Sequence, residues 1–233
     1  MALLLACLAV FPGFAGTVTG SVRLMDSHDP AVRKNNYYGV VIWLERTDGA
    51  ALPLQPKTAQ MAQRKKSFVP SVLAVPAGST VSFPNFDPIF HNVFSNYAGQ
   101  VFDVGLYAPG TDQKVVFRRA GIVRVFCNIH PTMSAIIVVA DTPYMAVSNP
   151  DGSFRIDNVA PGEYQLHLYH ERATGETLKA VERSLAVAND PVVVPTLNIS
   201  ETGYIQVPHK NKYGKEYPAV IEDRPMYPAG SKP

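Results

Sequence analysis

Residues 121–140 read GIVRVFCNIHPTMSAIIVVA and decide the fold of this chain. Two apolar runs, Ile122–Cys127 and Ala135–Val139, flank a short polar loop. In the first run Val123, Val125 and Cys127 alternate with other residues, so a strand turns these three side chains towards one face. We therefore predict two strands, with Cys127 facing inward at the end of the first, where the loop can fold over it.

Short runs of the same kind recur along the chain, bounded by Gly, Pro, Asn and Asp. No long segment has apolar residues at helical spacing, so we predict an all-β sandwich or barrel. The polar stretch Thr58–Ser67 is compatible with a short helix or an extended loop. The further predicted strands of the first half are Thr17–Leu24, Val40–Leu44, Val72–Val75, Val81–Phe83 and Lys114–Phe117.

The bulk composition excludes several classes of protein. Of the 233 residues, 46% are hydrophobic and 10% aromatic, which is typical of a globular protein and not of a disordered one. The net charge is +2, and Arg64-Lys65-Lys66 is the only dense basic run, so nucleic acid is not an expected partner. The chain is not expected to be transmembrane.

The first fifteen residues, Met1–Ala15, are apolar and uncharged and end in small residues, as in the hydrophobic part of a secretory signal. A basic start is missing, and Cys7 leaves a lipoprotein signal as an alternative. We expect an exported protein in the periplasm or another extracytoplasmic place. After removal of Cys7, Cys127 is the one remaining thiol and cannot form an internal disulfide.

Cys127 belongs to a group of residues with the chemistry of a metal site. His130 and Met133 lie on the loop that follows it, and His91 lies far upstream, before Asn92. Taken singly, each of these residues would more often serve packing than metal binding. Together, a thiolate, two imidazoles and a thioether are the donors of a blue-copper electron-transfer site. Asn92 is a candidate for a hydrogen bond that orients the ligands, and Pro131 stiffens the loop.

The other histidines give weaker signals. His167 and His170 are three residues apart in a predicted strand, so they face opposite sides and do not share a metal. His28 and His209 lie in polar loops and are expected to be solvated. Trp43 is expected to serve packing. We find no phosphate-binding loop, no nucleophile paired with a base and no catalytic residues.

The second half of the chain predicts a further β unit. Asn149-Pro150-Asp151-Gly152 is a strong turn signal, and Ala160-Pro161-Gly162 marks another turn before the alternating run Tyr164–Tyr169. Ser184–Val187 and Val192–Leu197 are further predicted strands. Residues 204–233 are rich in Lys, Tyr and Pro without periodicity, so we predict a flexible tail.

The His91-Asn92 pair and the Cys-x2-His-Pro-x-Met spacing resemble the cupredoxin superfamily, and amicyanin more closely than plastocyanin or azurin. The resemblance implies a Greek-key β-sandwich over residues 16–141, with His91, Cys127 and His130 as equatorial ligands and Met133 as the axial ligand. Residues 142–203 resemble the carboxypeptidase-regulatory, transthyretin-like β-sandwich. The whole chain resembles two-domain proteins of the methylamine-utilisation type, with additional sequence between Arg46 and Phe68.

By this resemblance we expect one copper per chain and one-electron transfer between Cu(II) and Cu(I) through the edge of His130. Pro131, Pro88 and Phe90 would surround that edge and dock a redox partner, a cytochrome or a dehydrogenase, through a weak and transient interface. An enzyme is not expected, because four protein ligands leave no open position for substrate. The alternatives are a non-redox copper-binding or storage protein and an envelope-structural protein with a degenerate site.

Overall fold

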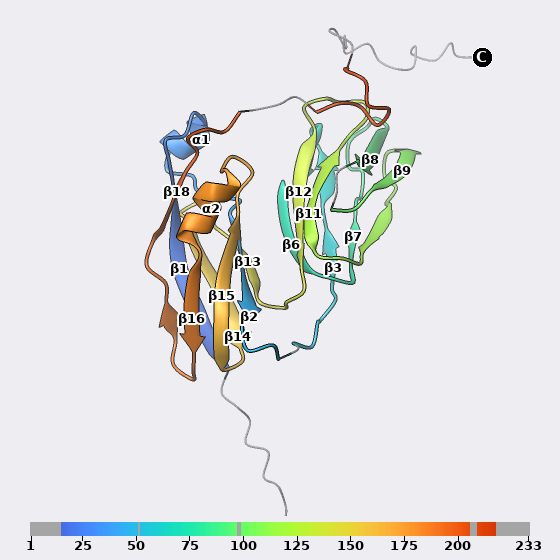
Figure 1. Ribbon diagram of the computed structural model, residues 1–233. Coiled ribbons are helices and arrows are strands. Elements are labelled where there is room, and N and C mark those ends of the chain that lie inside the picture. The colour runs from blue at the N-terminus through green and yellow to red at the C-terminus, as the bar shows by residue number, and fades with distance from the viewer. Residues whose placement is uncertain (1–14, 51, 97–98, 206–208, 218–233) are drawn as a thin grey trace, which may run out of the picture.

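The computed structural model describes residues 15–50, 52–96, 99–205 and 209–217, so the predicted signal segment lies outside it except for Ala15. Two β units lie side by side (Figure 1), which confirms the all-β fold class. Among the described residues, helices are limited to α1 (Pro30–Arg33) and α2 (Gly175–Val181). In this part of the chain no helix has the length and apolar character needed to cross a membrane.

The inserted unit, defined here as residues 58–140, contains two facing sheets and a small hairpin. The larger sheet has the strand order β6-β12-β11-β8-β9, in which β6 and β12 are parallel and the other pairs antiparallel. Its strands are β6 (Val72–Pro76), β8 (His91–Ser95), β9 (Phe102–Tyr107), β11 (Gly121–Phe126) and β12 (Ser134–Ala140). The facing sheet contains β3 (Thr58–Gln60), β7 (Ser79–Ser82) and β10 (Lys114–Phe117), and the hairpin is β4 (Ala62–Arg64) with β5 (Ser67–Val69).

The framing unit, defined here as residues 16–46 and 145–200, is a second pair of sheets. One sheet has the order β13-β2-β15-β16, and in the other β1 pairs with β14, β17 and β18. The strands from the start of the chain are β1 (Gly16–Met25) and β2 (Val41–Arg46). Those from its second half are β13 (Met145–Val147), β14 (Ser153–Val159), β15 (Gly162–Tyr169), β16 (Arg183–Val187), β17 (Val192–Val193) and β18 (Leu197–Ser200).

The strand pairing corrects the predicted boundaries at residues 16 and 142. The first two strands do not join the unit that follows them in sequence: β1 pairs with β14, and β2 pairs with β15 along Tyr164–Tyr169. Their inward residues, such as Val18 and Leu44, belong to one core with Leu197. Residues 58–140 are therefore inserted between two strands of the framing unit. Alternation along a strand predicts which residues face inward, but it does not identify the strand's partner.

Strand β12 explains why residues 135–140 are apolar throughout, because both of its faces are buried. Ala135, Ile137 and Val139 face the core of the inserted unit, which also contains Cys127 and Met133. The alternate residues of β12, Ile136 and Val138, pack instead with Val41 and Ala74 between the two units. A strand covered on both faces has a continuous apolar sequence. Strand β12, which follows the loop Cys127–Met133 (the proposed metal-binding loop), thus lies between two cores.

Candidate metal centre

Three of the four predicted ligands converge at one end of the inserted unit. His91 begins β8, Cys127 follows β11 directly, and His130 lies on the loop between β11 and β12. The Cys127 Sγ atom is 3.7 Å from His91 Nδ1 and 3.9 Å from His130 Nδ1. The ligand atoms of the three residues all lie within 4.8 Å of one another, with His91 and Cys127 fully buried and His130 partly buried.

This spacing fits a shared metal ion. With metal–sulfur and metal–nitrogen bonds of roughly 2.3 and 2.0 Å, as at zinc sites, and an angle of about 120° between them, sulfur and nitrogen lie about 3.7 Å apart. The two observed distances of 3.7 and 3.9 Å agree with that value. Thiolate and imidazole donors suit copper in both of its common oxidation states. The three side chains can therefore hold a metal with little movement.

Met133 closes the loop that carries Cys127 and His130. The Cys127 amide donates to the Met133 carbonyl at 3.2 Å, and the Met133 amide donates to the His130 carbonyl at 3.0 Å. The Met133 side chain is fully buried in the core that contains Cys127. Its position at the end of this loop is compatible with an axial ligand, and its role as a ligand stays a prediction.

Asp87 orients His91 and is a site residue that the sequence reasoning missed. One oxygen of its carboxylate lies 2.9 Å from His91 Nε2. The same carboxylate accepts hydrogen bonds from the amides of Lys65 (2.5 Å) and Lys66 (2.8 Å), both of which have positive φ in the turn between β4 and β5. A carboxylate beside Nε2 fixes the proton there and leaves the Nδ1 lone pair directed at Cys127 Sγ. The additional sequence between Arg46 and Phe68 thus supports a metal ligand.

The protonation of this pair suits metal binding. Burial lowers the pKa of His91 and outweighs the opposing effect of Asp87. Burial alone would raise the pKa of Asp87, but hydrogen bonds from Lys66, His91 and Lys65 outweigh it and lower the pKa of the carboxyl. A neutral imidazole beside an ionised carboxylate is the state in which Nδ1 can donate electrons to a metal.

Asn92 joins three segments at the site, in the orienting role that the sequence predicts. Its side-chain oxygen accepts a hydrogen bond from the amide of Asn128, the residue after Cys127, at 3.2 Å. Its side-chain nitrogen donates to Asp103 at 2.7 Å and to the Gly105 carbonyl at 2.9 Å, both in β9. The metal-binding loop is therefore tied to β8 and β9 through a buried side chain.

The described residues of the C-terminal segment also lie on this loop: residues 209–217, part of the predicted flexible tail, contact it at several points. His209, expected to be solvated, stacks on Phe126 with ring centroids 4.1 Å apart. Its Nε2 atom is 2.6 Å from the Pro131 carbonyl oxygen, and the Tyr217 hydroxyl donates to the Cys127 carbonyl at 2.9 Å. No period or motif in this polar segment indicates these contacts. The remainder of the predicted tail lies outside the described residues, apart from Tyr204 and Ile205.

His167 in β15 and His170 just after it do not form a second metal site. His167 stacks on Trp43 and contacts Glu45 and Glu182, whereas His170 is buried against Glu201. Within the described chain, the one group of His, Cys, Asp and Glu side chains that could hold a metal consists of His91, Cys127 and His130.

Comparison with known proteins finds a relative for part of the chain. It is 40% identical over 60 residues to methylamine utilization protein MauL of Methylorubrum extorquens, which is 25% of this chain and 53% of MauL. The chain thus spans about half the length of the curated relative it matches. Residues 138–194 match the family model described as polysaccharide lyase family 4, domain II. The carboxypeptidase-regulatory-like identity of residues 142–203 stays a prediction.

Solved structures with similar arrangements include several copper proteins. A purple cupredoxin from Nitrosopumilus maritimus is 26% identical, with 35% of this chain and 99% of that chain covered and a TM-score of 0.33. A mutant of amicyanin is 22% identical, with coverage of 39% and 90% and a TM-score of 0.34. The chain is thus similar over one segment to a protein of methylamine utilisation, and part of it resembles solved cupredoxin structures.

Proposed function

We propose that this protein is an exported type 1 copper protein that carries single electrons. The observation that supports the proposal is the convergence of His91 Nδ1, His130 Nδ1 and Cys127 Sγ at distances that suit one metal ion. Met133 would be the weak axial fourth ligand. The proposal includes one copper per chain, as the donor set accommodates a single ion.

Bound copper would supply one-electron chemistry by changing between Cu(II) and Cu(I). The protein's part is to hold the ligands so that they move little when the charge of the metal changes. Asp87 fixes the ring of His91, and the backbone bonds between Cys127, His130 and Met133 fix the loop. Because four protein ligands leave no position for substrate, the proposal excludes an enzyme.

The proposed electron route runs through the partly buried His130, the more accessible of the two histidines. Pro131, the residue after His130, is exposed, as is Pro88, three residues before His91, and Phe90 is partly exposed. A weak and transient interface with a cytochrome or a dehydrogenase would suit such a small surface. We propose an extracytoplasmic location, which fractionation of cells that express the full chain would test.

The metal itself is tested by adding Cu(II) to the purified full chain. We expect one copper per chain and an intense visible band from charge transfer between Cys127 and copper. Cys127→Ser should abolish the band, because a hydroxyl does not supply a soft anionic donor. His167→Gln is the matched control and should keep it, since His167 lies in the framing unit. A colourless wild-type complex would instead favour a non-redox copper-binding or envelope-structural protein.

A further inference from the structure

The C-terminal segment His209–Tyr217, called the strap below, contacts the metal-binding loop of the inserted unit. Figure 1 shows it beside β8 and β9 of the inserted unit, although it follows β18 of the framing unit in sequence. Its described residues contact the loop at three separate points, Cys127, Asn128 and Pro131. One segment therefore touches consecutive parts of the loop that carries two of the proposed ligands.

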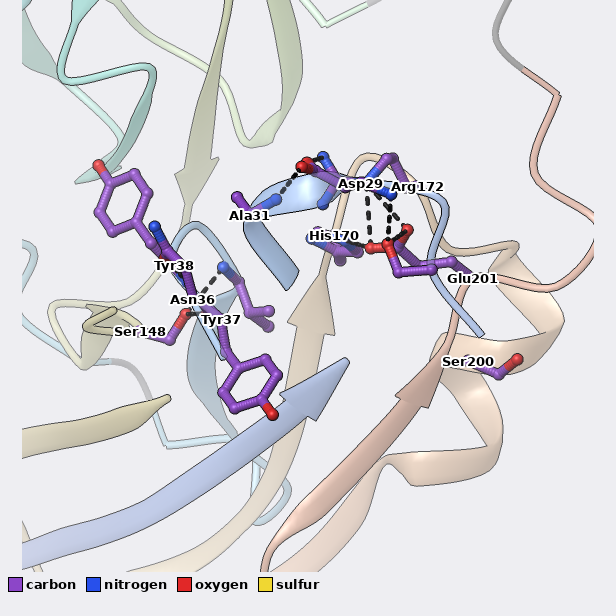
Figure 2. Close-up of polar contacts among 12 residues, drawn as sticks. Asp29, Ala31, Asn36, Tyr37, Tyr38, Ser148, His170, Arg172, Ser200 and Glu201 are labelled. Carbon is purple, nitrogen blue, oxygen red and sulfur yellow. Dashed lines mark hydrogen bonds and ion pairs between the residues drawn. The ribbon is translucent and has the colours of Figure 1, made fainter. Parts of the chain in front are cut away.

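The chain is firmly anchored where it leaves β18. Figure 2 shows Glu201, the first residue after that strand, with His170 and Arg172. The Glu201 carboxylate lies 2.8 Å from His170 Nε2, and Arg172 Nε donates to both of its oxygens at 3.0 Å. Ser27 donates to the same carboxylate, and Arg172 also pairs with Asp29 at 3.0 Å. This cluster, in which Glu201 and His170 are buried, fixes the chain where it leaves β18.

At the other end, Lys212 completes a ring of hydrogen bonds around the start of the loop. Its amide donates to the Asn128 side chain at 3.0 Å, and its ammonium group donates to Asp103 at 2.7 Å. Asp103 accepts from Asn92, and Asn92 in turn accepts from the Asn128 amide. The ring thus joins the strap, the loop, β8 and β9. Asn128, the residue after Cys127, is therefore hydrogen-bonded through its backbone amide to Asn92 and through its side chain to Lys212.

Two aromatic residues of the strap cover the backbone on either side of the ligands. The Tyr217 hydroxyl donates to the Cys127 carbonyl, and the His209 ring contacts both Phe126 and Tyr217. Phe126 ends β11 immediately before Cys127. A hydrogen bond to a ligand's own carbonyl restrains the backbone from which that ligand projects.

We propose that the strap holds the metal-binding loop closed, with Tyr217, Lys212 and His209 as positioning residues for the metal site. The proposal deepens the copper function and rests on it for the role of the loop, although the restraint on Cys127 exists with or without metal. It assigns the framing unit a purpose: the cluster at Glu201 anchors the segment that restrains the loop.

The test uses full-length protein with Cys7→Ser, so that Cys127 is the only thiol. The variants Tyr217→Phe and Lys212→Met each remove one hydrogen bond of the strap, and Tyr217→Phe keeps the ring against His209. Tyr213→Phe, a change at a 72% exposed residue of the same segment, is the matched control. The first readout, on metal-free protein, is the rate at which a small alkylating reagent modifies Cys127. The second, on copper-loaded protein, is the rate at which a Cu(I)-selective chelator removes copper after reduction.

We expect Tyr217→Phe and Lys212→Met to raise both rates roughly five-fold each, the effect of one hydrogen bond, with the control unchanged. The visible band should also shift, which a purely structural loss of stability would not cause. If both variants kept the wild-type alkylation rate, copper-removal rate and spectrum, the proposed role of the strap would be refuted. If wild-type protein binds no copper, the proposed function fails, and the alkylation rates still decide the inference: equal rates refute it and faster rates support it.

Discussion

At the scale of single residues, the site depends on how each ligand is held as much as on the ligands themselves. His91 presents Nδ1 to Cys127 because Asp87 occupies the other side of its ring. Cys127 and Met133 are restrained through the backbone of one short loop. Both kinds of restraint lead to measurable predictions for the reduction potential.

Asp87→Asn should raise the reduction potential and weaken metal binding by roughly ten- to a hundred-fold, the usual effect of losing such an orienting partner. A neutral amide makes His91 a weaker donor, and Cu(II) depends on that donor more than Cu(I) does. The amide also places N–H groups near the Lys65 and Lys66 amides, which need an acceptor. Voltammetry and copper titration measure both effects. Asp190→Asn, at an exposed position, is the control, and equal values in both variants would remove Asp87 from the site.

Met133→Leu should keep the colour and raise the potential, because loss of an axial donor destabilises Cu(II) more than Cu(I). Met133→Gln should lower it, because an amide oxygen is a harder donor. Met61→Leu is the matched control, since Met61 is equally buried in the same core. If Met133 only fills space, the Leu variant changes stability by less than about 1.5 kcal/mol and leaves the potential unaltered. Equal reduction potentials in the wild type and both Met133 variants would show that Met133 is not a ligand, and the site would then have three protein ligands.

At the scale of elements, β12 separates two cores, and this division predicts different effects for neighbouring residues. Val139 faces the core that holds the metal ligands, while Val138 faces the layer between the units. Truncation of either valine to Ala should reduce the free energy of unfolding by about 2 kcal/mol. Val139→Ala should also hasten copper loss, whereas Val138→Ala should keep the wild-type rate. Chemical unfolding and chelator kinetics measure the two effects, and identical copper kinetics in both variants would contradict the division.

The cluster at the end of β18 predicts an acid-sensitive framing unit. Burial alone would raise the pKa of Glu201, but hydrogen bonds from His170, Arg172 and Ser27 lower it to about 2. Because the folded pKa is depressed, its contribution of about 3 kcal/mol is present above the unfolded value and is lost as the pH falls from about 5 to 2. In metal-free protein, Glu201→Gln should therefore make the free energy of unfolding depend less on pH between about 5 and 2. Exposed Glu163→Gln should not, and a wild-type pH dependence in Glu201→Gln would refute the assignment.

At the scale of the whole molecule, the sequence predicts local features well and long-range partners poorly. The strands around Cys127 and the convergence of His91 and His130 on it follow from alternation, spacing and donor chemistry. The pairing of β1 with β14, more than a hundred residues away, cannot be predicted in this way, because the alternation along a strand does not identify its partner. The role of Asp87 could not be predicted from the sequence, because it depends on how the turn at Lys65 and Lys66 folds against His91. The role of the strap could not be predicted either, because it depends on contacts with distant residues.

The two units also act together in the structure. A buried cluster that contains Val41 of β2, Ala74 of β6 and Val138 of β12 joins them, and the strap contacts the loop between β11 and β12. The framing unit thus consists of segments that precede and follow the inserted unit in sequence. This arrangement suits a site whose ligands must move little between two charge states.

The most direct test of the central claim is voltammetry of the copper-loaded full chain, with electron spin resonance of its oxidised form. We expect a reversible one-electron couple, with one copper per chain and a spectrum typical of a thiolate-bound type 1 site. Cys127→Ser should lose both the couple and the spectrum. A wild-type protein whose bound copper gives no reversible couple, or the spectrum of ordinary square-planar Cu(II), would contradict the claim that this protein carries electrons.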